Sequence, residues 1–371
     1  MATRSGEVTG VLLYNLGGPH DLDAVEPFLF NLFSDREIIE LPFGAWGQPI
    51  VARVIARARA PSVRRNYSLI GGGSPQLRIT RAQAVALEHR LNAASDIPLG
   101  PNDTTPCASD HGTQESCSAA KRFRVVIAMR YSSPTADEAL SELDAAAVER
   151  VVSLTLFPQW SRATTGSWLG EFDRVLAMPR WRHHRFDISH IDRYPDDPLY
   201  LDAVADTVRS ALQRFAPEVR DRVVILFSAH GLPTRFVDAG DPYIEHVETT
   251  RRGVLERLRV PNREMLGFQS RTGPVKWIGP GTDELIRRLG AEGLEELLIV
   301  PLSFVSDHIE TLYEVDILFT ELARTVGITD CRRPEALNTS PLFIDALARL
   351  VERHLDARAQ SVVGMVGRGN R

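Results

Sequence analysis

The chain has 371 residues, of which 25% are charged and 43% hydrophobic, a composition typical of an ordinary globular protein. Its 43 Lys and Arg against 48 Asp and Glu give a formal net charge of −5, which argues against a general nucleic-acid binder because neutralising phosphates needs a basic surface. Three cysteines exclude a disulfide framework, and no apolar run is long enough to span a bilayer. The length predicts two domains, and the start of the chain lacks a signal-peptide pattern, so we expect a cytoplasmic protein.

Short β-branched runs recur along the chain, and each ends in a Gly, Pro or small polar turn. We expect strands at residues 8–16, 124–129, 151–157, 186–191, 222–227, 265–268 and 297–301. Helical patterns lie between them, at residues 82–92, 135–150 and 282–289. Strands that alternate with helices predict an α/β protein with parallel sheets, here in two similar halves.

Two segments depart from this rhythm. Residues 92–122 are rich in Ser, Thr, Asp, Gly and Pro, which predicts a long surface loop or insertion. Three glycines after residue 361 predict a disordered tail at 361–371. We therefore place a first domain at 8–189 plus 333–360, with a low-complexity insertion at 93–122, and a second domain at 190–332.

The first candidate functional residue is His230, which directly follows the apolar run RVVILFSA. Ligands of open α/β sheets bind beyond the carboxyl ends of the strands, which is where this histidine lies. A structural role fits the position equally well. The tight turn made by Gly231 and Pro233 favours an imidazole that projects outward, and imidazole suits proton transfer or metal ligation near neutral pH.

The second candidate is the acidic segment SDHIETLYE, at residues 306–314, which follows another apolar strand. If a helix begins at Asp307, then Asp307, Glu310 and Glu314 lie on one helical face. Acids at a helix start on a solvated face are the plainer interpretation. At the end of a strand, however, three carboxylates can bind a hard or borderline cation, with His308 as a further ligand.

Aromatic side chains form a third set, and most of them should belong to the core. Two places differ. The run FLFNLF at residues 28–33 lies close to the turn after the first strand, and Trp277 lies in a loop rich in Gly and Pro. Large apolar residues on loops at a site edge indicate a flat hydrophobic ligand or a membrane surface. The motifs G-x-S-x-G and H-E-x-x-H are absent, which argues against a serine hydrolase and a zinc protease.

At this point the motifs resemble those of a known family, the ferrochelatases, which insert ferrous iron into a porphyrin at the end of haem synthesis. Nine segments carry the resemblance in order along nearly the whole chain. They are LYNLGGP (13–19), FLFNLFSDREIIELP (28–42), YSLIGGGSP (67–75), MRYSSP (129–134), LFPQWSRATTGS (156–167), FSAHGLP (227–233), GFQSRTGPVKWIGPGTDE (267–284), SFVSDHIETLYEVDI (303–317) and LNTSPLF (337–343).

The resemblance implies two Rossmann-like, doubly wound domains, each with a mainly parallel four-stranded sheet and with the active-site cleft between them. It implies insertion of Fe²⁺ into protoporphyrin IX with release of two protons. The alternatives are a chelatase that acts on coproporphyrin III or inserts cobalt into another tetrapyrrole, and a non-catalytic porphyrin or haem binder on the same scaffold.

The resemblance also assigns roles to residues. It makes His230 and Glu310 the catalytic metal-insertion site, with His230 either the acceptor of pyrrole protons or an iron ligand. It makes Asp307, His308 and Glu314 an acidic conduit for iron or protons. The residues that it implies for porphyrin binding are Leu16, Arg130, Tyr131 and Trp277, with Phe28 and Phe33 in an apolar lip.

Several positions depart from the family pattern. Leu16 stands where a tyrosine marks the coproporphyrin-using branch, which favours protoporphyrin IX, and Leu318 stands where many relatives have the outermost acid. Some relatives carry a [2Fe–2S] cluster, but here Arg162 takes the place of one cysteine ligand. With only Cys107, Cys117 and Cys331 in the chain, we expect no such cluster and no required cofactor besides the Fe²⁺ substrate.

The partners implied are the porphyrin and ferrous iron, with peripheral membrane contact through the lip and no nucleic acid. The oligomeric state is left open.

Overall fold

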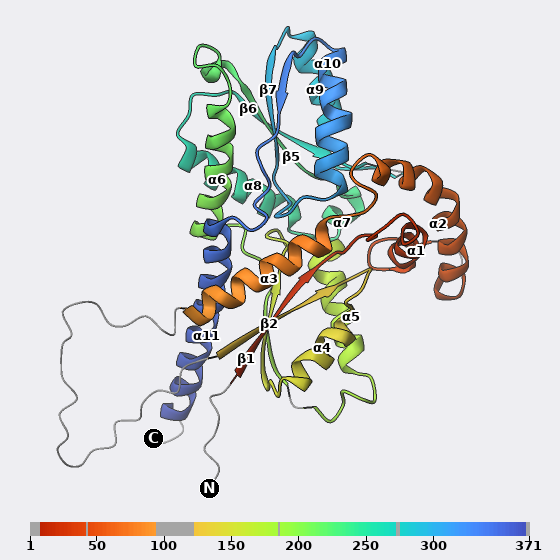
Figure 1. The fold of residues 1–371 in the computed structure, drawn as a ribbon, viewed down its shortest axis with the longest axis vertical. Coiled ribbons are helices and arrows are strands. Elements are labelled where there is room, and N and C mark those ends of the chain that lie inside the picture. The colour runs from red at the N-terminus through yellow and green to blue at the C-terminus, as the bar shows by residue number, and fades with distance from the viewer. Residues whose placement is uncertain (1–7, 42–43, 94–121, 185, 272–274, 369–371) are drawn as a thin grey trace, which may run out of the picture.

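The computed structural model describes residues 8–41, 44–93, 122–184, 186–271 and 275–368, and the side chains of these residues as far as residue 361. The chain forms two parallel four-stranded sheets flanked by helices, one above the other in Figure 1. The predicted α/β fold with two similar halves is therefore confirmed. Most of the predicted insertion at 93–122, including Cys107 and Cys117, lies outside the described residues.

The first sheet has the strand order β2-β1-β3-β4, and all of its pairs are parallel. Its strands are β1 (Val8–Asn15), β2 (Arg122–Met129), β3 (Arg150–Thr155) and β4 (Asp187–Ile191). The second sheet repeats this order as β6-β5-β7-β8, also with parallel pairs. Its strands are β5 (Val224–His230), β6 (Glu264–Gln269), β7 (Glu296–Pro301) and β8 (Asp330–Arg332). In each sheet the order reverses beside the first strand, so the switch points lie at the ends of β1 and β5.

The sequence predicted seven of these eight strands and missed β8. This strand has only three residues and pairs with β7 alone. A run so short carries no period-two pattern, so only its pairing in the sheet defines it.

Helices connect the strands and cover the sheets. In the first half they are α1 (Val25–Ser34), α2 (Gly44–Ser68), α3 (Gln76–Ala93), α4 (Ala136–Ala145), the π-helical turn η1 (Arg162–Gly166) and α5 (Ser167–Leu176). The second half has α6 (Pro198–Gln213), the 3₁₀ turn η2 (Arg220–Arg222), α7 (Thr234–Asp238), α8 (Tyr243–Leu258), α9 (Thr282–Ala291), the π-helix η3 (Glu310–Phe319) and α10 (Thr320–Thr325). Helix α11 (Pro341–Arg368) ends the described chain and packs on α3 and α6.

Local sequence explains why several of these helices begin where they do. The Thr135 hydroxyl accepts a hydrogen bond from the backbone N–H of Glu138, whose side chain binds the Thr135 N–H in return, a capping box that starts α4. The Asp197 side chain accepts a hydrogen bond from the Tyr200 N–H and so caps the start of α6, with Pro198 in the first turn.

The prediction of a disordered tail from residue 361 is wrong for residues 361–368, because α11 continues to Arg368. Glycine lowers helix stability by only about 1 kcal/mol relative to alanine, so Gly364 and Gly367 do not have to end a helix.

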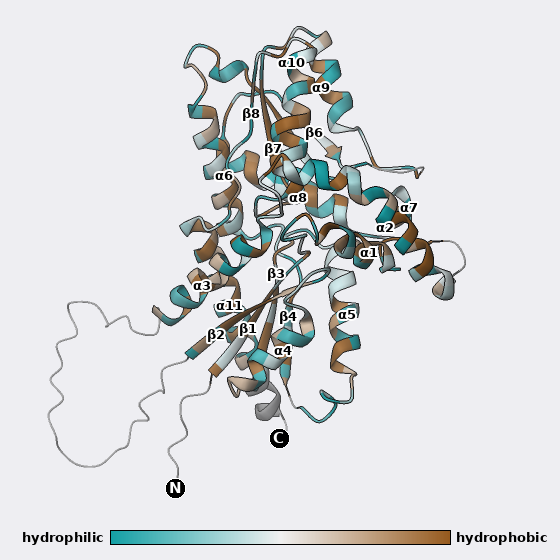
Figure 2. Ribbon diagram, turned by 45° about the vertical axis from the view of Figure 1, so that its right-hand side comes forward, coloured by the Kyte–Doolittle hydropathy of each residue, from teal (hydrophilic) through white to brown (hydrophobic). Residues whose placement is uncertain are grey.

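The two halves share one continuous core. A single cluster of buried side chains joins Leu13 and Val125 of the first sheet to Phe227 and Val300 of the second. Separate clusters fill the other face of each sheet, and Figure 2 shows hydrophobic residues concentrated along the strands. None of the helices in the described part of the chain combines the length and the hydropathy that a bilayer crossing needs.

Candidate active site

His230 lies at the end of β5, the switch point of the second sheet, with its backbone fixed on both sides. Its N–H donates to the Ser303 hydroxyl at 2.9 Å, and its carbonyl accepts from the Tyr243 hydroxyl at 3.0 Å. The backbone is thus satisfied without the ring, and the side chain remains 37% exposed. The imidazole is therefore held in place but open to a ligand.

The ring of His230 meets the carboxylate of Glu310, the first residue of η3. The distance from His230 Nδ1 to Glu310 Oε2 is 2.7 Å, and the Glu310 side chain is 20% exposed. Burial alone would lower the pKa of His230, but the Glu310 carboxylate outweighs burial and raises it above 6.5. The pKa of Glu310 is lowered, against the effect of burial, by the same contact. The pair is thus a carboxylate that favours the protonated form of the imidazole it contacts.

Two residues at the end of β6 bind the acids of η3. The Ser270 hydroxyl contacts Oε2 of both Glu310 and Glu314, and the Ser270 N–H donates to Glu314 Oε1 at 2.8 Å. The Gln269 amide donates to Glu314 Oε2 and to the Glu310 carbonyl, both at 3.1 Å. Burial and the neighbouring Glu310 charge raise the pKa of Glu314. The structure therefore brings Glu310 and Glu314 together around one serine.

The predicted line of three carboxylates on one α-helical face is wrong in two respects. The helix begins at Glu310 rather than Asp307, and it is a π-helix with i→i+5 hydrogen bonds. Asp307 lies before it and is bound by Arg333 at 3.0 Å and by the Asn338 amide at 2.9 Å. This carboxylate is thus bound by tertiary partners that the local sequence does not show. Among the described residues no three His, Cys, Asp or Glu side chains converge in the arrangement of a metal site.

His308 lies on the same side of the site as His230, with an aromatic ring between them. The Phe304 ring is 4.5 Å from the His308 ring and 6.4 Å from the His230 ring, measured between centroids. His308 Nδ1 is 3.0 Å from the Ser306 carbonyl. Burial lowers the pKa of His308, so this imidazole is neutral at neutral pH.

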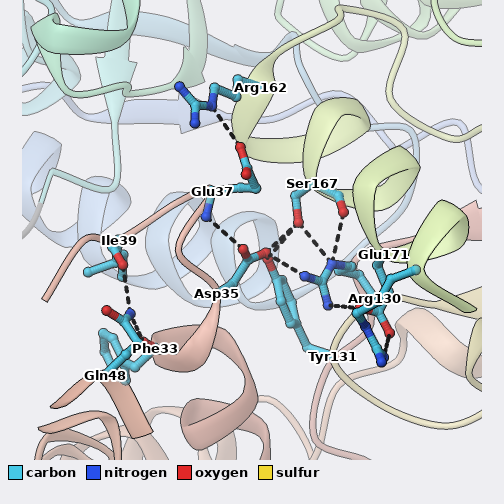
Figure 3. A network of polar contacts seen from close by, with 11 residues as sticks. Phe33, Asp35, Glu37, Ile39, Gln48, Arg130, Tyr131, Arg162, Ser167 and Glu171 are labelled. Carbon is cyan, nitrogen blue, oxygen red and sulfur yellow. Dashed lines mark hydrogen bonds and ion pairs between the residues drawn. The ribbon is translucent and has the colours of Figure 1, made fainter. Parts of the chain in front are cut away.

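On the first half, Arg130 and Tyr131 are bound by a carboxylate of the chain itself, that of Asp35 (Figure 3). Asp35 Oδ2 accepts from Arg130 Nη2 at 2.8 Å, from the Tyr131 hydroxyl at 2.6 Å and from the Ser167 hydroxyl. Its Oδ1 accepts the Glu37 N–H at 2.8 Å. The Asp35 side chain is only 4% exposed.

This network changes the expectation for two predicted porphyrin-binding residues. The Arg130 side chain is 16% exposed and its charge is met by Asp35, while Tyr131 is buried with its hydroxyl in the same network. The Tyr131 hydroxyl and Arg130 Nε and Nη2 are thus engaged within the chain. Both still lie at the carboxyl end of β2, where Tyr131 N donates to the Leu16 carbonyl at 3.0 Å.

The predicted apolar lip, residues 28–33, lies in α1, which packs against α2. Phe33 lies inside their shared cluster, 9% exposed, while Phe28 packs beside it and contacts the Tyr131 ring edge to face. Ile309, directly before Glu310, packs against the same cluster. The lip of the first half thus adjoins the acidic helix of the second.

Trp277 lies close to the His230 turn, in an isolated bridge with Pro233. The space where a Gly231 side chain would begin is 3.4 Å from its ring, and its indole N–H has no hydrogen-bond partner among the described residues. Leu16, half-buried at the end of β1, donates its backbone N–H to Asn15 Oδ1 at 2.8 Å. Cavities of about 490 and 20 Å³ lie along α6 and the segment before α11, and neither is lined by His230 or Glu310.

Comparison with known proteins now decides the family. The family model described as Ferrochelatase matches residues 8–355. The chain belongs to the ferrochelatase family. The ferrochelatase of Geotalea uraniireducens is 48% identical over 94% of this chain and 98% of its own length. That of Synechocystis sp. is 44% identical over 92% of this chain and 81% of its own length.

Among solved structures, SirB from Bacillus subtilis with Fe3+ covers 93% of this chain and 94% of its own, at 10% identity and a TM-score of 0.49. No argument below depends on this match.

Sequence reasoning missed several residues of this ferrochelatase-family site. Asp35, Gln269 and Ser270 stand inside motifs that carried the resemblance, but a lone polar residue in a loop does not reveal its partner. Asp35 and Arg130 are 95 positions apart, and Ser270 and Glu314 are 44 apart. Only the fold brings them together.

Proposed function

We propose that this protein inserts Fe²⁺ into protoporphyrin IX to give protohaem and two protons, as the final step of haem synthesis. Membership of the ferrochelatase family supports the activity. The single observation that carries the site assignment is the contact between His230 Nδ1 and Glu310 Oε2 at 2.7 Å. This contact supports a role for His230 as a base and for Glu310 as an anionic metal ligand, at the switch point of the second sheet.

The electrostatics of this pair support a coupling between the two substrates. Before iron arrives, the Glu310 carboxylate keeps the pKa of His230 raised, which favours the protonated ring. A divalent cation at Glu310 neutralises that carboxylate. Burial then dominates and lowers the pKa of His230, so the proton leaves and the free ring can accept a proton from a pyrrole N–H. In this proposal His230 is the base and iron makes it available.

The surroundings of Arg130, at the carboxyl end of β2, support protoporphyrin IX over coproporphyrin III as the substrate. Protoporphyrin carries two propionates and coproporphyrin carries four, so the latter must place a carboxylate on every side of the ring. At the end of β2 the Arg130 charge is already paired with Asp35. A propionate bound there would lose its hydrating water without gaining a new charged partner in exchange.

An anaerobic assay with Fe²⁺ and either porphyrin, followed by product absorbance, tests the proposal. We expect turnover with protoporphyrin IX, and its loss in His230→Ala and Glu310→Gln, with the folded structure preserved in both. Absence of turnover with every porphyrin would leave the non-catalytic binder as the better explanation. Near-normal rates in both variants would contradict the site, and faster turnover of coproporphyrin III would contradict the substrate.

We also propose peripheral contact between α2 and a membrane surface of a cytoplasmic enzyme. Trp46, Ile50 and Val54 are 94%, 71% and 64% exposed and recur every four residues, which places them on one helical face. Arginines on the same helix suit an anionic lipid surface. Replacing all three by Ser should abolish flotation with anionic vesicles, whereas Val85→Ser, at an equally exposed residue of α3, should not. Equal flotation of both variants would refute the contact.

We further propose that the enzyme needs no resident cofactor. The Arg162 side chain at the family's cysteine position is bound to Glu37, with 2.7 Å between Nε and Oε2. Burial raises the pKa of Cys331 to about 12, which keeps it a thiol, whereas cluster ligands are thiolates. Iron and sulfide analysis of the purified protein, with its ultraviolet–visible spectrum, should show no cluster.

A further inference from the structure

Arg333 lies between β8 and α11 and contacts acids on both sides of Glu310. Its Nη1 is 3.0 Å from Asp307 Oδ1, ahead of η3. Its Nε and Nη2 are 2.7 and 2.8 Å from the two carboxylate oxygens of Asp316, within η3. The Arg333 side chain is only 12% exposed. A guanidinium fork that binds one carboxylate with two bonds fixes direction as well as distance, which a lysine does not.

Asn338 holds Asp307 from another side. The Asp307 N–H donates to Asn338 Oδ1 at 3.0 Å, and Asn338 Nδ2 donates to Asp307 Oδ2 at 2.9 Å. The Asn338 backbone has a φ of 42°, in the left-handed region, which persists in a non-glycine residue only where the surroundings determine it. The Asn338 carbonyl accepts a hydrogen bond from the Gln83 side-chain amide at 2.8 Å, which links Asn338 to α3 in the first half of the molecule.

The helix between these anchors needs such support. Long stretches of π-helix are rare because the i→i+5 pattern is less favourable than the α-helix, and η3 has no side-chain cap at its start. Glu310 lies between the two carboxylates that Arg333 binds. Any relaxation of η3 toward another helical pattern would shift Glu310 relative to His230, which is fixed on β5.

We propose that Arg333, supported by Asn338, is a positioning residue that holds η3 in its π-helical register and thereby sets the distance from Glu310 to His230. Arg333 acts through Asp307 and Asp316 and touches neither substrate. Asp307 is then an anchor of the helix rather than a step of an acidic conduit. The kinetic consequence rests on the proposed function, but the structural one does not.

The chain supplies a matched control for this idea. Arg332, the preceding residue, is also paired with an acid, with 2.6 Å from its Nε to Asp330 Oδ1, and it bonds the Arg214 carbonyl rather than η3. Arg332→Gln therefore removes a comparable ion pair from the same segment. Arg333→Gln removes both charge and fork, and Arg333→Lys keeps the charge but loses the fork.

Hydrogen-exchange mass spectrometry of the wild type, Arg332→Gln, Arg333→Gln and Arg333→Lys tests whether Arg333 stabilises η3. In Arg333→Gln we expect exchange of peptides covering residues 310–319 to speed up at least about tenfold, with α4 and α5 unchanged and Arg332→Gln like the wild type. Arg333→Lys should resemble Arg333→Gln. Unchanged exchange in η3, or the same increase in Arg332→Gln, would overturn the proposal. Should Arg333→Gln fail to fold, Asp316→Asn removes the two-bond contact alone and must show the same local effect.

Steady-state kinetics supply the second arm. A carboxylate displaced by about 1 Å can lower the rate on the order of a hundredfold, so kcat/KM for Fe²⁺ should fall by tenfold or more in Arg333→Gln. The KM for porphyrin should stay within about twofold, because the lip is untouched. Faster exchange in η3 with unchanged kinetics would refute the positioning role. If no protein, wild type included, turned over, the proposed function would fail while the exchange data still decided the role of Arg333.

Discussion

Asp35→Asn is the substitution with the largest expected effect on stability outside the His230–Glu310 pair. The carboxylate is 4% exposed and its Oδ2 accepts from Arg130, Tyr131 and Ser167, while Oδ1 accepts the Glu37 N–H. Asparagine keeps one oxygen, which can retain the three side-chain donors. Its NH₂ group must then face the Glu37 N–H, and because both groups are donors the hydrogen bond between them is lost. The substitution also leaves the largely buried Arg130 with only Glu171, whose Oε2 is 4.0 Å from Arg130 Nη1, as a charged partner.

The magnitude follows from these contacts. Removing one partner of a buried ion pair destabilises by about 3–5 kcal/mol, and the oxygen that asparagine keeps places this case near 3 kcal/mol. An unfolding entropy of about 2.1 cal/mol/K per residue gives roughly 0.8 kcal/mol/K for 371 residues. The melting temperature should therefore fall by about 4 °C.

Thermal unfolding by calorimetry, beside Glu37→Gln as the control, measures the effect. Glu37 belongs to the same segment, but its pair with Arg162 is about half exposed on both sides, so its loss should lower the melting temperature by less than about 1 °C. If the two variants melted within 1 °C of each other, the contacts of Asp35 would not stabilise the fold as argued.

Two further predictions concern the acids and the imidazole. The pKa of His230, followed by NMR and assigned with His230→Ala, should lie above 6.5 in the wild type and should fall in Glu310→Gln, where only the Glu314 charge still opposes burial; no downward shift would contradict the pairing. Because the pKa of His230 is raised and that of Glu310 is lowered to about 2, the pair stabilises the fold fully only between about pH 4.5 and 6.5. This stabilisation is lost as the pH rises through the folded pKa of His230 and as it falls through that of Glu310. Ser270→Ala should raise the KM for Fe²⁺ several-fold and leave the KM for porphyrin unchanged, since the hydroxyl holds Glu310 and Glu314 together; a rise in the porphyrin KM alone would be inconsistent with that role.

Much of the fold was predictable because its signals are local. The apolar runs of β1, β3, β5 and β7 show their strands directly, and the capping box of α4 shows where that helix begins. His230 was predictable for a related reason. A histidine at the end of a buried strand lies at the carboxyl edge of a parallel sheet whatever the rest of the chain does.

The departures arise where a distant partner decides. Arg130 was expected to face a ligand carboxylate, but Asp35, 95 positions earlier, binds it. Asp307 was expected on one helical face with Glu310, but it precedes η3 and is bound by Arg333 and Asn338. A charged side chain can pair with any group of opposite charge. Which pair forms therefore depends on which partner the fold brings within hydrogen-bond distance.

The sequence by itself thus determined the α/β class, the two alike halves, the family and the residues that meet at the ends of β1 and β5. The tertiary structure alone decided that η3 is a π-helix, that Ser270 joins Glu310 to Glu314 and that Asp35 neutralises Arg130. Periodicity and turn chemistry act over a few residues and can be read along the chain. Hydrogen bonds between residues 40 to 100 positions apart exist only once both sheets have formed and packed.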